Sequence, residues 1–295
     1  MEVKTIMIVG AGFMGAGIAQ VGAEVGYQII LNDVSEDAVQ RGLGTVTKNL
    51  TKNVQKGKLT EDEKSATLAR ISTTTSLEAA KDADLVIEAV FENADLKKAI
   101  FQQLDEICKP DCIFASNTSS IPISQLAAAV KRPDKFIGMH FFSPVPVMKL
   151  VELIRGIKTS QETLVTVEEV AAKMKKETVR VKDVPGFLVN RINNALRQEA
   201  YKCLEEGVAS VQDIDKALKL GLRHPMGPFE LADFVGLDVG LNIVKTLYDG
   251  YKDPKWRPSL ILEQLVLAGD LGRKSGKGWY DYTSGEMKPR TDVEF

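Results

Sequence analysis

One histidine and one glutamate lie in neighbouring apolar segments and could form an acid–base pair. His140 ends the run FIGMH, and Glu152 lies in the next apolar run, MKLVELI, after the short connection SPVPV. A carboxylate among apolar residues is costly unless it has a partner. If the two runs form adjacent strands, Glu152 reaches one ring nitrogen of His140 and supports positive charge on the ring. The pattern favours this pair over a Glu152 that is merely exposed on an edge strand.

The remaining histidine and the cysteines point to no chemistry of their own. His224 lies in the turn-like segment RHPMGP, where we expect a hydrogen-bonded structural residue. Cys108 and Cys112 lack the second cysteine pair that a zinc site of this kind uses, so we expect no metal. With Cys203 the count is odd and sparse, which favours reduced thiols over a disulfide framework.

A glycine-rich loop joins the first predicted strand to a helix. It consists of Gly10, Ala11, Gly12, Phe13, Met14 and Gly15. In this setting the first glycine makes the turn, the second lets the backbone approach a pyrophosphate, and the third lets the helix pack closely on the strand. The loop amides and the helix N-terminus then supply donors for the phosphates. The loop therefore predicts a dinucleotide site.

An aspartate stands where such a site needs a carboxylate. Asp33 follows the second predicted strand, 18 residues after Gly15. There it can accept hydrogen bonds from both ribose hydroxyls. Because its charge would repel a 2′-phosphate and no arginine follows closely, we expect NAD rather than NADP as the cofactor.

Two further polar groups allow more than one interpretation. The segment SNTSS, residues 116–120, follows the fifth predicted strand and could bind a nicotinamide carboxamide and a substrate oxygen, or could be an ordinary polar turn. Lys48, Lys52 and Lys56 recur every four residues along a predicted helix. This stripe is either a solvated helix face or a site for a phosphorylated substrate tail, and both alternatives stay open.

Short apolar runs alternate with helical segments through about residue 182. The predicted strands are Thr5–Val9, Gln28–Asn32, Ile71–Thr74, Leu85–Ala89, Ile113–Ser116, Phe136–His140, Leu150–Ile154 and Thr178–Val181. The predicted helices between them are Gly15–Val25, Glu36–Lys56, Glu61–Ala69, Asp95–Ile107 and Glu162–Lys175. Continuous apolar runs are typical of strands covered on both faces. The alternation predicts an α/β fold with a Rossmann-type, doubly wound, mostly parallel sheet.

The pattern of apolar residues changes at the segment DVPG, residues 183–186, after which few strand-like runs occur. The later segments all have helical patterns: Asn190–Glu206, Val211–Leu220, Pro228–Tyr248 and Ser259–Ala268. We therefore predict a Rossmann-type domain over residues 1–184 and an all-helical C-terminal domain over residues 185–295.

Length and composition are those of an ordinary globular protein. The 295 residues are 44% hydrophobic and 26% charged, with a net charge of −2, which excludes disordered and low-complexity classes and gives no general attraction to nucleic acid or anionic membranes. The apolar N-terminus lacks a convincing cleavage site, and no stretch approaches the length of a membrane span. We expect a cytoplasmic protein.

These motifs together resemble the 3-hydroxyacyl-CoA dehydrogenase family, in particular its bacterial 3-hydroxybutyryl-CoA dehydrogenases. The resemblance extends from Val3 to Tyr282 and includes GAGFMG, DLVIEAVFEN, FASNTSS, GMHFFSPVPVMKLVE, VPGFLVNR, HPMGPFEL and GRKSGKGWYDY. It implies a homodimer that interconverts 3-hydroxybutyryl-CoA and acetoacetyl-CoA with NAD, His140 moving the hydroxyl proton while C3 exchanges a hydride with the nicotinamide.

The resemblance also implies roles for individual residues. The catalytic pair is His140 and Glu152, and the substrate contacts are Ser119 and Asn190. The cofactor contacts beyond the glycine loop and Asp33 are Glu92, Lys97, Asn117, Ser119, Ser143 and Lys274. Coenzyme A contacts in the family come from the helix after the second strand, which favours Lys52 and Lys56.

The sequence departs from the family pattern at two places. Ser143 stands where the family commonly has an asparagine near the nicotinamide, which puts that cofactor contact in doubt. The run Asn193-Asn194-Ala195 replaces a more apolar, proline-containing one and changes the expected acyl pocket.

Two other functions compete with this interpretation. A β-hydroxyacid dehydrogenase or imine reductase shares the glycine loop but usually relies on a lysine, and His140 with Glu152 argues against it. A crystallin-like structural role is opposed by the combination of Ser119, His140, Glu152 and Asn190.

Overall fold

The computed structural model describes residues 1–293, which divide into two compact units, Met1–Val184 and a second that begins at Pro185. The first unit is built on an eight-stranded sheet in the order β3-β2-β1-β4-β5-β6-β7-β8. All neighbouring strands are parallel except β6 and β7, which are antiparallel. The strands are β1 Thr5–Val9, β2 Gln28–Asn32, β3 Ile71–Thr74, β4 Leu85–Glu88, β5 Ile113–Ser116, β6 Phe136–Phe141, β7 Leu150–Arg155 and β8 Glu177–Lys182.

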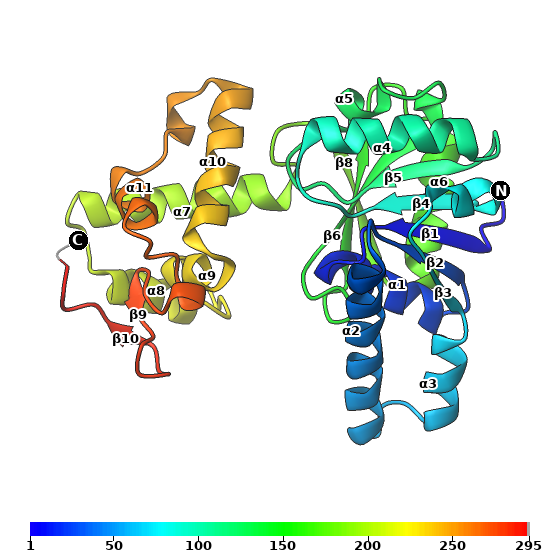
Figure 1. Ribbon diagram of the computed structural model, residues 1–295. Helices are drawn as coiled ribbons and strands as arrows, with labels where there is room; N and C mark the ends of the chain where they lie inside the picture. Colours follow the sequence, from blue (N-terminus) through cyan, green and yellow to red (C-terminus); the bar gives the residue numbers. More distant parts are fainter. Residues whose placement is uncertain (294–295) are drawn as a thin grey trace. The chain divides into compact units, whose positions relative to one another are not determined.

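Helices cover both faces of this sheet (Figure 1). They are α1 Phe13–Glu24, α2 Glu36–Gln55, α3 Glu61–Leu68, α4 Ala94–Ile107, α5 Ile123–Ala127 and α6 Gln161–Lys173, with 3-10 helices η1 Leu77–Asp82 and η2 Pro133–Lys135. Apolar residues of α1, α2 and α6 share one core with the sheet. On the other face Phe101 of α4 packs its ring against Phe114 and Phe136, at centroid distances of 5.9 Å and 4.6 Å. Both faces of the inner strands are therefore buried, as their continuous apolar runs indicated, whereas the edge strands β3 and β8 are partly exposed.

The second unit is almost entirely helical. Its elements are α7 Val189–Glu205, α8 Val211–Gly221, α9 Pro228–Val235, α10 Leu237–Tyr251, η3 Pro254–Trp256, α11 Leu260–Leu267, η4 Arg273–Ser275, β9 Tyr280–Asp281 and β10 Lys288–Pro289. The rings of Tyr201, Phe229 and Trp279 pack together in its core. The predicted fold class, a doubly wound and mostly parallel sheet followed by a helical domain, is confirmed.

One element was predicted wrongly. The segment expected as a single helix over Pro228–Tyr248 is two helices, α9 and α10, separated by Gly236. Gly236 has a φ of +104°, a conformation that side chains disfavour, and the next amide, of Leu237, donates to the Leu271 carbonyl. A hydrogen bond to a distant segment thus accompanies the break in the helix, and the apolar periodicity of the sequence cannot predict that break. None of the helices in residues 1–293 is long and apolar enough to span a membrane.

Candidate active site

The glycine loop between β1 and α1 has the shape that a pyrophosphate requires. Gly10 has a φ of +103°, and a Cβ there would lie 2.7 Å from the Ala89 carbonyl oxygen. A Cβ on Gly15 would lie 1.8 Å from the Gly10 carbonyl oxygen. Gly12 caps α1 without a side-chain hydrogen bond, and a Cβ there would meet nothing within 4 Å. The helix N-terminus is therefore left to backbone amides beside open space, which suits a phosphate group.

Asp33 follows β2 beside this loop. Its Oδ2 accepts a hydrogen bond from the Ala11 amide at 2.7 Å, and its Oδ1 accepts one from the Val34 amide at 2.7 Å. Each carboxylate oxygen keeps further acceptor capacity for a hydroxyl donor. A pocket of about 560 Å³ adjoins it, and its lining includes Gly10, Asp33, Val34, Val90, Leu96 and Ile100. The residues present fit an adenosine ribose and its base.

His140 and Glu152 face each other across the antiparallel strands β6 and β7. They are register partners, and the His140 Nδ1 lies 2.7 Å from the Glu152 Oε2. Glu152 has no exposed surface and His140 is 7% exposed. The ring of Phe142 packs against the imidazole at a centroid distance of 4.7 Å. The buried carboxylate therefore fixes the orientation of the ring.

The segment after β5 is gathered around a single carboxylate oxygen. The Glu92 Oε1 accepts hydrogen bonds from the Thr118 hydroxyl at 2.6 Å, the Ser119 amide at 3.0 Å, and the Ser120 amide and hydroxyl at 3.0 Å and 2.8 Å. The Ser119 hydroxyl lies 3.4 Å away, the longest of these contacts. Burial raises the pKa of Glu92, but the Lys97 ammonium and these donors outweigh it, so that pKa lies below its usual range. Glu92 therefore carries a negative charge that orders the loop.

A side-chain amide connects this segment to the histidine strand. The Asn117 Oδ1 accepts a hydrogen bond from the Phe141 amide at 2.9 Å. Because Phe141 follows His140 in β6, Asn117 lies close to the pair of His140 and Glu152. Ser143, two residues further on, is exposed.

Lys52 and Lys56 line a pocket of about 330 Å³ formed by α1, α2 and the segment between β6 and β7. Lys48 of the same stripe is exposed and does not line it. The buried Lys176 ammonium donates to the backbone carbonyls of Val145, at 2.5 Å, and Met148, at 2.8 Å. The segment between β6 and β7, which forms one wall of this pocket, is thus held in place by the Lys176 side chain.

Two predicted site residues belong to the second unit. Asn190 lies in the first turn of α7, and its backbone carbonyl accepts a hydrogen bond from the Asn194 side chain at 2.8 Å. The Lys274 ammonium binds both carboxylate oxygens of Asp238, at 2.6 Å and 2.7 Å. Their approach to the residues of the first unit remains a prediction.

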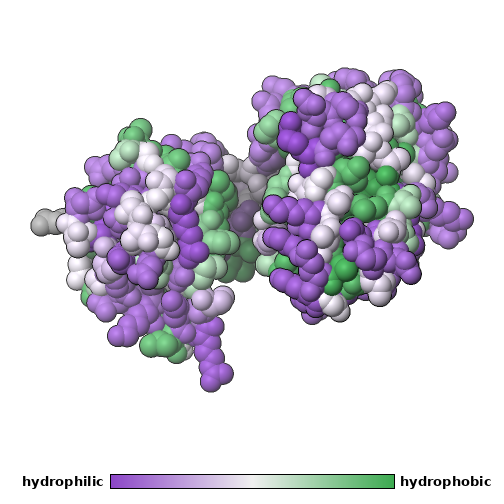
Figure 2. Space-filling model, turned by 60° about the horizontal axis from the view of Figure 1, so that its bottom comes forward, coloured by the Kyte–Doolittle hydropathy of each residue, from purple (hydrophilic) through white to green (hydrophobic). Residues whose placement is uncertain are grey.

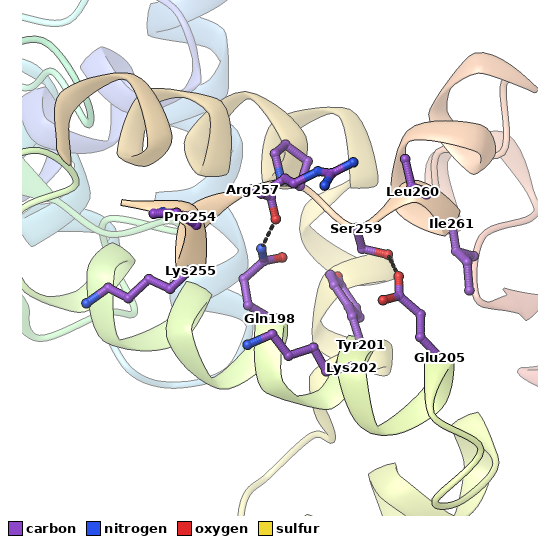
Figure 3. Close-up of a pocket in the computed structure, with 11 residues that line it drawn as sticks. Gln198, Tyr201, Lys202, Glu205, Pro254, Lys255, Arg257, Ser259, Leu260 and Ile261 are labelled. Atoms are coloured by element: carbon purple, nitrogen blue, oxygen red, sulfur yellow. Dashed lines mark hydrogen bonds between the residues drawn. The ribbon is translucent and has the colours of Figure 1, made fainter. Parts of the chain in front are cut away.

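Other features stand apart from this constellation. The three cysteines are free thiols, and residues 1–293 hold no cluster of three or more histidine, cysteine or carboxylate side chains that could bind a metal. His224 lies in the turn between α8 and α9. A pocket of about 430 Å³ in the second unit lies between α7 and the segment around Arg257, where Gln198 donates to the Arg257 carbonyl (Figure 3). None of the predicted site residues lines it.

Sequence reasoning missed Glu88, which ends β4 with no exposed surface. Its Oε2 accepts the Ser116 hydroxyl at 2.6 Å, and its Oε1 accepts the Lys97 ammonium at 2.5 Å. The signal was present, because Glu88 is a carboxylate inside an apolar run, as Glu152 is. Lys97 itself is 1% exposed, so it lies beneath the site surface rather than on it.

Comparison with known proteins decides the family. The model of the 3-hydroxyacyl-CoA dehydrogenase NAD binding domain matches residues 5–184, and that of the 3-hydroxyacyl-CoA dehydrogenase C-terminal domain matches residues 186–282. The chain belongs to the 3-hydroxyacyl-CoA dehydrogenase family. The predicted resemblance is confirmed, and the chain is an oxidoreductase of this family with an NAD-binding domain.

Similar members of the 3-hydroxyacyl-CoA dehydrogenase family match along nearly their whole length. A probable 3-hydroxybutyryl-CoA dehydrogenase of Bacillus subtilis is 50% identical over 282 residues, covering 96% of this chain and 98% of its own. A 3-hydroxybutyryl-CoA dehydrogenase of Bradyrhizobium diazoefficiens is 47% identical over 287 residues, covering 97% and 98%. The crystal structure of (S)-3-hydroxybutyryl-CoA dehydrogenase from Ralstonia eutropha superposes with a TM-score of 0.93 at 50% identity, covering 95% of this chain and 99% of that one.

Proposed function

We propose that this protein is an NAD-dependent dehydrogenase that interconverts (S)-3-hydroxybutyryl-CoA, with related short-chain 3-hydroxyacyl-CoA thioesters, and acetoacetyl-CoA or the corresponding 3-oxoacyl-CoA. The observation that carries the proposal is the buried contact of 2.7 Å between the His140 Nδ1 and the Glu152 Oε2. The names of the similar dehydrogenases support the substrate class.

The histidine moves the proton of the reaction. In the oxidative direction the His140 Nε2 accepts the 3-hydroxyl proton as the C–O bond gains its double-bond character, and in the reductive direction it returns that proton. When bound, the nicotinamide supplies or accepts the hydride at C3. Glu152 holds the Nδ1 side of the ring and stabilises the imidazolium formed during oxidation. No other charged group is required for the proton balance.

Two hydrogen-bonding side chains position the substrate. Ser119 and Asn190 bind the reacting oxygen and the thioester region. Contacts to Glu92 fix the Ser119 amide, at 3.0 Å, and the neighbouring Thr118 hydroxyl, at 2.6 Å. The backbone that carries the Ser119 side chain is therefore held in place.

The cofactor and the coenzyme A moiety are bound on different sides of the glycine loop. The loop amides would hold the pyrophosphate and Asp33 the ribose hydroxyls, which favours NAD over NADP. Glu92, Asn117, Ser143 and Lys274 would contact the nicotinamide half, with Lys97 behind them. The pocket lined by Lys52 and Lys56 would take the phosphates of coenzyme A, and its apolar wall of Pro144, Val145 and Pro146 suits the pantetheine chain.

The two units divide these roles. Residues 1–184 would bind NAD, and residues 185–295 would contribute Asn190 and the surface of a homodimer. Large apolar side chains are exposed on the second unit, among them Leu220, Leu222, Phe234, Val235 and Val239. Figure 2 shows apolar patches on this unit among hydrophilic ones, and such patches suit an interface between copies.

Replacing the histidine tests the proposal. We expect His140→Gln to lower kcat for acetoacetyl-CoA reduction by roughly 10²–10⁴ and to leave NADH binding unchanged, because it removes only the proton-transfer group. Unchanged turnover in that variant would remove His140 from the mechanism.

A further inference from the structure

A buried carboxylate outside the acid–base pair, Glu88, is hydrogen-bonded to the segment that carries Ser119. Glu88 ends β4 with no exposed surface. Its Oε1 accepts the Lys97 ammonium at 2.5 Å and the Val90 amide at 2.7 Å, and its Oε2 accepts the Ser116 hydroxyl at 2.6 Å. Removing a carboxylate from water is costly unless its oxygens are fully paired, so this geometry is tightly specified.

Lys97 carries the effect of Glu88 to the surface. The ammonium lies 2.5 Å from Glu88, 3.2 Å from the Val90 carbonyl and 3.4 Å from the Glu92 Oε2. The ammonium donates hydrogen bonds to Glu88 and to the Val90 carbonyl, and it forms an ion pair with Glu92. With 1% of its surface exposed, Lys97 therefore acts on a bound ligand through Glu92, whose side chain is 37% exposed.

Glu92 and Ser116 then hold the loop from both ends. Glu92 accepts the Ser119 amide and both donors of Ser120. At the other end, Ser116 donates its hydroxyl to Glu88 and accepts the Thr118 amide at 3.2 Å. Both routes converge on Glu88, so one buried charge determines where residues 116–120 lie.

We infer that Glu88 is a positioning residue for the reaction, which sets the place of Ser119 through Ser116 directly and through Lys97 and Glu92 indirectly. The inference rests on the proposed function, since it takes Ser119 to bind the substrate. Misplacing a substrate-holding group by a fraction of an ångström to 1 Å is enough to slow a reaction strongly.

Glu88→Gln tests the inference because it keeps the size of the side chain and removes its charge. We expect kcat/KM for acetoacetyl-CoA, measured with saturating NADH, to fall about 10- to 100-fold. Made in a Ser119→Ala background, the same substitution should change kcat/KM by less than about threefold, because the residue through which it acts is gone. Fully additive losses would overturn the inference, since they would show that Glu88 acts independently of Ser119.

Asp105→Asn is the matched control. Asp105 is a buried carboxylate near the other end of α4, where it accepts the Arg132 Nε and the Lys131 amide, both at 2.6 Å. Its loss should lower the melting temperature without changing kcat/KM. A Glu88→Gln variant that behaved in the same way would have a structural role only, which would overturn the inference.

Two further measurements keep the outcomes distinct. If Glu88→Gln does not fold, Ser116→Ala removes one of the two routes and leaves the ion pair of Glu88 with Lys97 in place. Unchanged kcat/KM in a folded Ser116→Ala variant would count against the inference. If the wild-type protein does not oxidise NADH with acetoacetyl-CoA, the proposed function itself is refuted. If the wild type is active and a folded Glu88→Gln variant is equally active, only the role of Glu88 is refuted.

Discussion

Replacing Glu152 by Gln tests the buried pair without changing its shape. The amide can still accept a hydrogen bond from the imidazole, but the negative charge 2.7 Å from the His140 Nδ1 is lost. With charge centres about 4 Å apart and an effective dielectric constant of about 20, that charge stabilises an imidazolium by about 4 kcal/mol. A barrier higher by that amount lowers kcat by about 10³-fold. The prediction therefore concerns kcat, because the charge matters only when the ring is protonated.

The assay is steady-state oxidation of (S)-3-hydroxybutyryl-CoA at saturating NAD, the direction in which the imidazolium forms, with the NADH dissociation constant measured separately by fluorescence. We expect kcat to fall by about 10³ while NADH binding stays unchanged. Glu168→Gln is the control, since Glu168 forms an ion pair with Arg180 at 2.6 Å outside the site and should not affect kcat. A Glu152→Gln variant whose kcat stayed within about threefold of wild type would refute the electrostatic argument.

Three further predictions concern the cofactor, the thioester and the second unit. Asp33→Ser combined with Val34→Arg should shift the ratio of kcat/KM for NADPH and NADH by about 10- to 100-fold toward NADPH. The double substitution replaces a charge that repels the 2′-phosphate of NADPH with one that attracts it, and an unchanged ratio would refute the ribose role of Asp33. Lys52→Ala with Lys56→Ala should raise KM for acetoacetyl-CoA about tenfold at low salt with kcat unchanged, and an effect that persisted at high salt would contradict phosphate binding. Burial raises the pKa of Asp233 from 3.8 to about 6, so its stabilising contribution is present at acidic pH and lost as the pH rises through about 6. Between pH 4 and 7 the free energy of unfolding in urea should fall by up to about 3 kcal/mol more for the wild type than for Asp233→Asn. A difference between the two free energies that did not change with pH would contradict this assignment.

Local patterns were sufficient for much of the fold. The strands of the first unit and the glycine loop were predictable because a covered parallel strand needs a continuous apolar run and a tight strand-to-helix turn needs glycine. Helix α3 was predictable from its capping box, in which Thr60 and Glu63 satisfy each other's backbone amides. These features depend on neighbours in the sequence, so periodicity and residue type reveal them.

Features that depend on distant partners were not predictable in this way. Gly236 breaks the helix expected over Pro228–Tyr248 because the next amide bonds to the Leu271 carbonyl, a contact between segments far apart in the chain. The family resemblance implied that Lys97 contacts the cofactor, yet its side chain is buried against Glu88, on a strand nine residues earlier. For Glu152 the residue types indicated both the need for a partner and the partner itself, whereas the partner of Glu88 is determined by the packing of α4 on the sheet.

The central claim is tested most directly by NADH oxidation with acetoacetyl-CoA, measured beside NADPH and beside free acetoacetate. The account predicts fast turnover with NADH and the thioester, and slow or absent turnover with NADPH or with the free acid. Activity on free acetoacetate but not on its thioester would contradict the proposed substrate, and tight NADH binding without turnover of either would contradict the proposed activity.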